Sequence, residues 1–185
     1  MKIMGIDLAL NKVGIAFFNT SDPKWDDVFL LSVKKNKSSR TRLIDLEGFD
    51  KFIGIASLIR NLILMKSPDV IAMEDFSFGS QGRAVFEIGQ LTGIVRLALH
   101  SDGYTEKNEK LILVAPTQVK KAATGKGNAS KIQVIMAVCK KTGQEYVEQF
   151  GAEAEDVCDA VGVVMAYLDM ENKVRKGMKL KGHGK

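Results

Sequence analysis

The first nineteen residues contain two apolar runs that are separated by one carboxylate and a short polar stretch. Residues 2–7 end in Asp7, and residues 13–19 form the second run. This pattern predicts a buried strand, a tight turn and an antiparallel return strand. A charge at the end of a buried strand is costly unless it meets a cation or a hydrogen-bond donor. Asp7 is therefore either a turn cap or part of a polar site, and later parts of the chain favour the second interpretation.

The remaining chain alternates between short apolar runs and segments with helical spacing. Strands are predicted at 27–33, 69–73 and 111–115, and helices at 45–66, 82–100, 116–123, 130–141 and 153–171. Three strands come first as a meander, and strands and helices alternate afterwards. This order predicts an α/β fold with a mixed five-stranded sheet and helices on both faces.

The length and composition fit one globular domain. The chain has 185 residues, of which 45% are hydrophobic, so we expect a domain over 1–171 followed by a basic tail over 172–185. Asp7 interrupts the N-terminal apolar run too early for a signal peptide, and no segment has the length of a membrane span. Cys139, Cys158 and the two histidines lack metal-ligand spacing. These features predict a cytoplasmic protein with free thiols and argue against a zinc site.

The net charge of +5 is unevenly distributed. From residue 172 onward there are six basic residues and no acid, and the rest of the chain is close to neutral. A second basic group lies between 116 and 144, where there is again no acid, and a third lies in the loop 34–42. Clustered lysines on a neutral body favour a polyanionic partner, although a solvated surface is the simpler explanation for the tail.

Acidic residues recur where the predicted elements would bring them together. Asp7 and Glu74 end predicted strands, and Asp156 and Asp159 lie at i and i+3 on the last helix, on one face. Stabilisation of the helix N-terminus explains Asp156 well. It explains Asp159 poorly, because Asp159 begins the apolar face of the helix and must point inward.

Four inward-facing carboxylates would repel one another unless cations neutralise them. Hard oxygen ligands suit Mg²⁺, with two ions per site expected and Mn²⁺ able to substitute. Two such ions can support phosphodiester cleavage, and the lysine clusters could bind the phosphates of a nucleic acid. A metal-dependent nuclease is thus the leading hypothesis. An ATPase related to the sugar kinases and a non-enzymatic binding module stay open. The ATPase is disfavoured because residues 11–14 have too little glycine to cradle phosphates.

Four motifs in order resemble the RuvC family of Holliday-junction resolvases, which are RNase H-like endonucleases. They are Gly5-Ile6-Asp7 with Gly14, the segment 72–76 with 89–93, the lysine-bearing segments 118–121 and 127–134, and the acidic helix 154–162. The resemblance covers roughly residues 3–168. It implies an RNase H-like fold, a homodimer and Mg²⁺-dependent nicking of two strands of a four-way DNA junction.

The resemblance also implies roles for single residues. Asp7, Glu74, Asp156 and Asp159 would be metal ligands, and Lys120 and Lys131 would act at the scissile phosphate. The family's inserting aromatic residue aligns with Ser77 here, so Phe78 would have to take over stacking at the junction. Further DNA contacts are predicted at Arg83, Lys121, Lys126, Lys35 and Arg40. The helix that follows Glu74, with its small residues and Phe86, is the predicted dimer face.

Two alternatives remain open within this interpretation. The enzyme could cut several branched DNAs, such as Y-forks and flaps, without preferring four-way junctions. The chain could instead be a junction-binding protein without activity, although the presence of all four acids argues against it.

Overall fold

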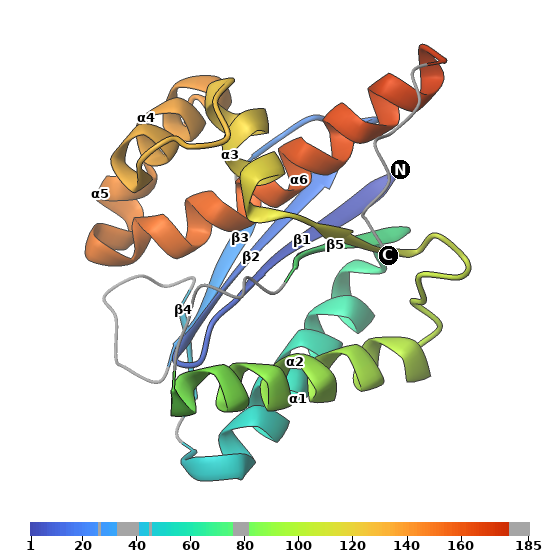
Figure 1. Ribbon diagram of the computed structural model, residues 1–185, viewed down its shortest axis with the longest axis vertical. Helices are drawn as coiled ribbons and strands as arrows, with labels where there is room; N and C mark the ends of the chain where they lie inside the picture. Colours follow the sequence, from blue (N-terminus) through green and yellow to red (C-terminus); the bar gives the residue numbers. More distant parts are fainter. Residues whose placement is uncertain (26, 33–40, 45, 76–81, 178–185) are drawn as a thin grey trace.

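The structure is a computed structural model that describes residues 1–25, 27–32, 41–44, 46–75 and 82–177. A central mixed sheet lies between two layers of helices (Figure 1). The strands are β1 (Lys2–Leu8), β2 (Lys12–Asn19), β3 (Val28–Ser32), β4 (Thr41–Leu43), β5 (Val70–Glu74) and β6 (Leu111–Val114). Their order in the sheet is β4-β3-β2-β1-β5-β6, so the N-terminal hairpin occupies the centre.

The five predicted strands are present, and β4 is a sixth strand that the sequence analysis placed in the loop 34–42. Its three residues pair in parallel with β3 at the sheet edge. Three residues are too few for an alternating pattern to stand out in a sequence. The strands β1 to β3 form the predicted antiparallel meander, and β1, β5 and β6 are parallel neighbours.

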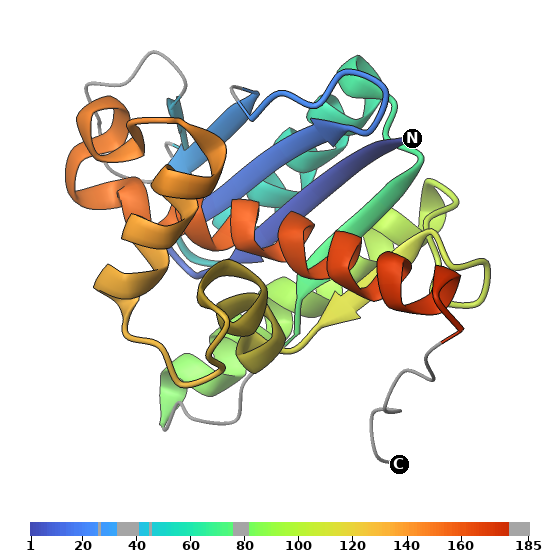
Figure 2. The same ribbon diagram turned by 90° about the horizontal axis from the view of Figure 1, so that it is seen from above.

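The helices divide between the two faces of the sheet. One face is covered by α1 (Gly48–Lys66) and α2 (Arg83–Ser101), and the other mainly by α6 (Ala154–Arg175). Seen from above, α6 crosses the central strands, and α3 to α5 lie beside it (Figure 2). The remaining helices are α3 (Pro116–Thr124), α4 (Lys131–Thr142), α5 (Tyr146–Phe150) and the single 3₁₀ turn η1 (Gly151–Glu153).

Local sequence signals explain several helix ends. Ser130 caps α4: its hydroxyl accepts from the Gln133 amide, while the Gln133 side chain accepts from the Ser130 amide. The short helix α5 lies in a predicted loop and is fixed by the burial of Tyr146 and Phe150. The last helix runs four residues beyond its predicted end, so Lys173 and Arg175 belong to α6 and not to a tail.

Alternation along the strands separates two hydrophobic cores. On β1, Ile3 faces the core beneath α6, whereas Met4 and Ile6 face the core beneath α1 and α2. The same alternation places Asp7 on the α6 side of the sheet. Among the residues that the structure describes, none of the helices has the length and apolar character that a bilayer crossing requires.

Candidate active site

Two carboxylates end neighbouring strands on the face that α6 covers. Asp7 lies near the end of β1 and shares its face with Ile3. Glu74 ends β5 and shares its face with Val70 and Ala72. Because β1 and β5 are parallel neighbours, the two carboxylates meet at the same edge of the sheet. The pairing of β1 with β5 therefore brings two of the four predicted metal ligands together.

Two glycines let α6 approach this face closely. A Cβ atom on Gly5 would lie 2.5 Å from the Ala160 carbonyl oxygen, and one on Gly14 would lie 1.9 Å from the Asp156 carbonyl oxygen. Gly14 is also the direct cross-strand partner of Asp7. The first turns of α6 consequently lie over the strand ends, and Asp156 and Asp159 reach the neighbourhood of Asp7 and Glu74.

The electrostatics show that the four predicted ligands share one environment. Burial, followed by the charges of Glu74, Asp159 and Asp156, raises the pKa of Asp7 well above its usual value. Burial and Asp159 raise the pKa of Glu74 to about 7. Burial and the acids Glu155 and Asp156 raise the pKa of Asp159 to about 6. Each carboxylate thus disfavours ionisation of its neighbours.

The two predicted catalytic lysines lie on different helices beside these acids. Lys120, on α3, is close enough to lower the pKa values of both Glu74 and Asp159. Lys131 begins α4 and forms an ion pair with Glu155, which raises the Lys131 pKa. Lys120 therefore acts on two of the predicted ligands, Glu74 and Asp159, whereas Lys131 acts on Asp159 and is held in an ion pair with Glu155.

Lys12 also belongs to the site, although it was not among the residues predicted from the sequence. Its ammonium group lies 3.7 Å from an Asp156 carboxylate oxygen and 3.9 Å from one of Glu153. The sequence did contain an indication of this position. Lys12, Gly14 and Ala16 are alternate residues of β2, so Lys12 lies on the same face as the other two, toward α6. The pattern alone could not say that an acid of α6 would stand opposite.

A groove of about 510 Å³ opens beside the carboxylates. Asp7, Glu74 and Asp156 line it together with Asn11 and Lys12 of the β1–β2 turn region, and residues of α2 complete its wall. Asp7, Glu74 and Asp156 are therefore accessible to a ligand that enters this groove.

The donor set fits a hard divalent cation. Carboxylate oxygens are the ligands that Mg²⁺ and Mn²⁺ accept in proteins, and the raised pKa values are those expected where a neutralising cation belongs. In the part of the chain that the structure describes, no three acid, histidine or cysteine side chains already converge at ligating geometry. Small side-chain rearrangements would accompany metal binding.

Comparison with known proteins identifies the family. Residues 3–167 match the model of the family described as crossover junction endodeoxyribonuclease RuvC. The chain belongs to the RuvC family. A crossover junction endodeoxyribonuclease RuvC from Caldicellulosiruptor saccharolyticus is 28% identical over 91% of this chain and 92% of its own. One from Prochlorococcus marinus is 27% identical over 92% of this chain and 98% of its own.

A solved structure supports the fold. Thermus thermophilus RuvC in complex with a Holliday junction substrate superposes with a TM-score of 0.68, at 17% identity and 96% coverage of both chains. The RNase H-like fold is confirmed, and so is the prediction of a junction-resolving endodeoxyribonuclease. The ATPase and the purely structural binding module, which were open from the sequence, are not supported.

The predicted DNA contacts of this RuvC-family chain lie in several places. Arg83 begins α2, is exposed and pairs with Glu87 at 2.7 Å. Lys121 and Lys126 are exposed at the end of α3 and in the loop that follows it. Ser77, Phe78, Lys35 and Arg40 lie outside the described residues. Their predicted roles at the junction stay predictions.

Proposed function

We propose that this RuvC-family nuclease resolves four-way junctions by metal-dependent hydrolysis, with Asp7, Glu74, Asp156 and Asp159 holding Mg²⁺. Family membership supports the reaction, since nucleases of this family depend on divalent metals. The observation that carries the ligand assignment is the buried position of Asp7 among four further acids, Glu74, Asp159, Asp156 and Glu155, that raise its pKa. An aspartate that only capped a turn would not be stabilised by acidic neighbours.

The chain's own residues would divide the work between binding metal and handling phosphate. When bound, two divalent ions supply an activated water and stabilise the leaving oxygen of a phosphodiester. The four carboxylates would hold those ions. Lys120 lies beside Glu74 and Asp159, where its ammonium group would stabilise negative charge developing on the phosphate. Lys131 would approach the same phosphate after leaving Glu155.

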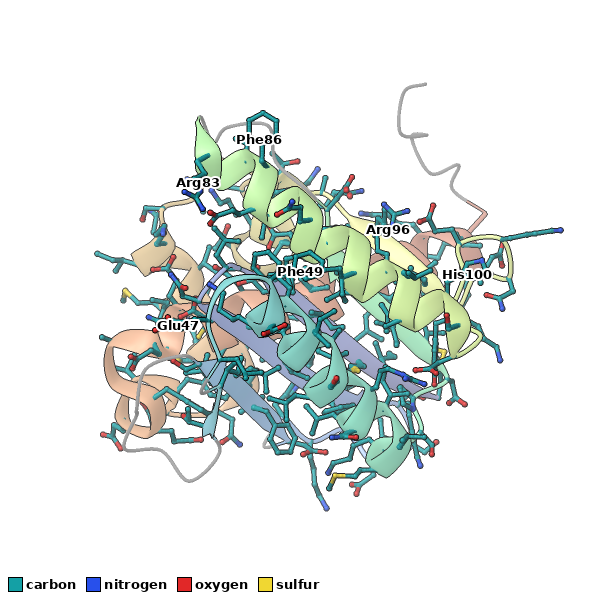
Figure 3. The ribbon with its side chains drawn as sticks, turned by 90° about the horizontal axis from the view of Figure 1, so that it is seen from below. Glu47, Phe49, Arg83, Phe86, Arg96 and His100 are labelled. Atoms are coloured by element: carbon teal, nitrogen blue, oxygen red, sulfur yellow. The ribbon has the colours of Figure 1, made fainter. Side chains whose placement is uncertain are left out.

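A homodimer is the proposed assembly, and the outer face of α2 is its proposed interface. Phe86 and Leu97 are 75% and 69% exposed on this helix. At Gly89 and Gly93 an added Cβ would meet nothing within 4 Å, so these glycines do not serve packing inside the protomer. Figure 3 shows Phe86 on the outside of α2, away from the sheet. Two copies of such a face would present two active sites to the two strands of a junction.

The DNA would extend from the carboxylate groove across the basic helices. Lys121, Lys126 and Arg83 are the described candidates for backbone contacts. Ser77, Phe78, Lys35 and Arg40 complete the proposed set, with Phe78 stacking at the crossover. The cytoplasm is the proposed compartment, in keeping with Cys139 and Cys158 being free thiols.

The deciding experiment compares Mg²⁺-dependent cleavage of an immobile four-way junction with that of a linear duplex of the same sequence. Cut positions are mapped at one fixed salt concentration, with EDTA as the control. Paired symmetric nicks near the crossover are expected on the junction alone. Equal cleavage of Y-forks and flaps would replace junction resolution by general branched-DNA cleavage. Tight binding without cleavage in Mg²⁺ or Mn²⁺ would contradict the proposed function.

A further inference from the structure

Lys12 lies where β2 begins, on the side of the sheet that faces α6. It precedes Gly14 by two residues, so alternation along the strand directs both toward the first turns of α6. Its side chain is about one-third exposed (31%), and it lines the groove that also contains Asp7 and Glu74. Lys12 therefore belongs spatially to the metal site although it is remote from the acids of α6 in sequence.

The contacts of Lys12 are electrostatic and shared between two acids. Its ammonium nitrogen lies 3.7 Å from Asp156 Oδ2 and 3.9 Å from Glu153 Oε1, both beyond ordinary hydrogen-bond length. After burial, Lys12 has the largest effect on the pKa of Asp156, which it lowers. The ammonium group is thus a nearby positive charge that stabilises ionised Asp156 without being locked to it.

This arrangement differs from those of the other two lysines of the site. Lys131 pairs with Glu155, which is outside the proposed ligand set. Lys120 acts on Glu74 and Asp159 and is not among the groups that shift the pKa of Asp156. Lys12, in contrast, pairs with Asp156, which is a proposed metal ligand. Its ammonium group and a bound divalent cation would therefore lie beside the same carboxylate.

We propose that Lys12 is a built-in counter-cation of Asp156 that competes with the divalent metal ion and weakens metal binding to the DNA-free enzyme. The inference rests on the proposed metal site. A cation that binds Asp156 has to overcome the repulsion of the ammonium group or displace it. Asn11 and Lys12 line the groove, so a DNA phosphodiester bound there would lie beside them. The ammonium group of a displaced Lys12 would then form an ion pair with this phosphodiester. Substrate binding would thereby free Asp156 and favour metal uptake.

The test measures Mn²⁺ and Mg²⁺ binding to the DNA-free protein by isothermal titration calorimetry. Lys12→Met retains the length and apolar stem of the side chain and removes its charge. We expect its metal dissociation constant to fall about threefold or more relative to wild type, and the difference to shrink at high ionic strength. Lys12→Arg keeps the charge and should bind metal like wild type.

Two further variants make the result interpretable. Lys51→Met is the matched control, because Lys51 contacts the same turn through a 3.1 Å hydrogen bond to Asn11 Oδ1 and should leave metal affinity unchanged. Asp7→Asn removes a proposed ligand and should weaken metal binding strongly. If Asp7→Asn weakens binding and Lys12→Met binds metal no more tightly than wild type, the role of Lys12 is contradicted and the proposed function stands. If wild type and Asp7→Asn bind metal equally, the proposed metal site itself is contradicted, and the inference falls with it.

Discussion

The carbonyl oxygen of Asp156 occupies the space beside Gly14 that any other residue's Cβ would fill, at 1.9 Å from the ideal Cβ position. Gly14 pairs directly with Asp7 across the β1–β2 hairpin. One missing side chain thus determines how closely the acidic end of α6 approaches the first carboxylate of the site. The glycine is required here by contact with another backbone and not by an unusual φ angle.

Gly14→Ala should therefore disturb both stability and the site. A methyl group against a backbone carbonyl forces α6 away from the sheet, and we expect the free energy of unfolding to fall by about 3 kcal/mol. Urea unfolding followed by circular dichroism measures this. Ser57→Ala is the control, since Ser57 is exposed on α1 and outside the proposed interface, and alanine is the better helix former. Similar losses for both variants would argue against the close approach of α6.

Asp7→Asn should abolish cleavage and preserve junction binding. The amide retains the shape of the side chain but removes the charge that a metal ion requires, so the cleavage rate should drop roughly 100-fold or more. Gel-based cleavage in Mg²⁺ and fluorescence anisotropy with a labelled junction separate the two effects. Cleavage at the wild-type rate would remove Asp7 from the ligand set.

The metal-free protein should become less stable as the pH rises from about 4.5 to about 7. Glu74 has an ordinary pKa of 4.5, which the fold raises to about 7. Between these two pKa values Glu74 holds its proton in the folded state more often than in the unfolded state. The contribution of Glu74 to stability is therefore fully present below pH 4.5 and is lost as the pH rises through about 7. Asp159, raised to about 6, changes stability in the same direction.

Thermal unfolding in EDTA at several pH values tests this dependence. Glu74→Gln removes the titrating group and should flatten the profile between pH 5 and 7. Added Mg²⁺ should restore stability most strongly above pH 7, where the carboxylates are ionised and bind the cation best. A wild-type profile parallel to that of Glu74→Gln would contradict the raised pKa.

Phe86→Asp should convert the proposed dimer into a monomer and uncouple the two expected nicks. A carboxylate at a position that is 75% exposed costs the protomer little but cannot be buried unpaired between two copies of α2. Light scattering after size exclusion reports the mass, and strand-resolved cleavage reports whether nicks still come in pairs. Val174→Asp, on the helix that covers the other face of the sheet, is the control and should remain dimeric. A dimeric Phe86→Asp protein would place the interface elsewhere.

Local sequence patterns predicted most of the helices and strands and indicated the role proposed for the carboxylates. The alternation along residues 2–7 directs Asp7 inward, and the apolar helical spacing that begins at Asp159 directs Asp159 inward. Both directions follow from local backbone geometry. Local patterns of the same kind predicted five of the six strands in the described part of the chain. The order of the motifs was sufficient to indicate the RuvC family before any contact was known.

Which charges meet depends on how the helices and strands pack against one another. Lys12 and Asp156 are far apart in the chain, and their pairing depends on Gly5 and Gly14 admitting α6 to the sheet. The strand β4 likewise forms because it pairs with the edge strand β3. Gly89 and Gly93 point outward because the opposite face of α2 packs against the core. Local patterns set side-chain directions within one element. The distance between elements is set by packing, which no single segment encodes.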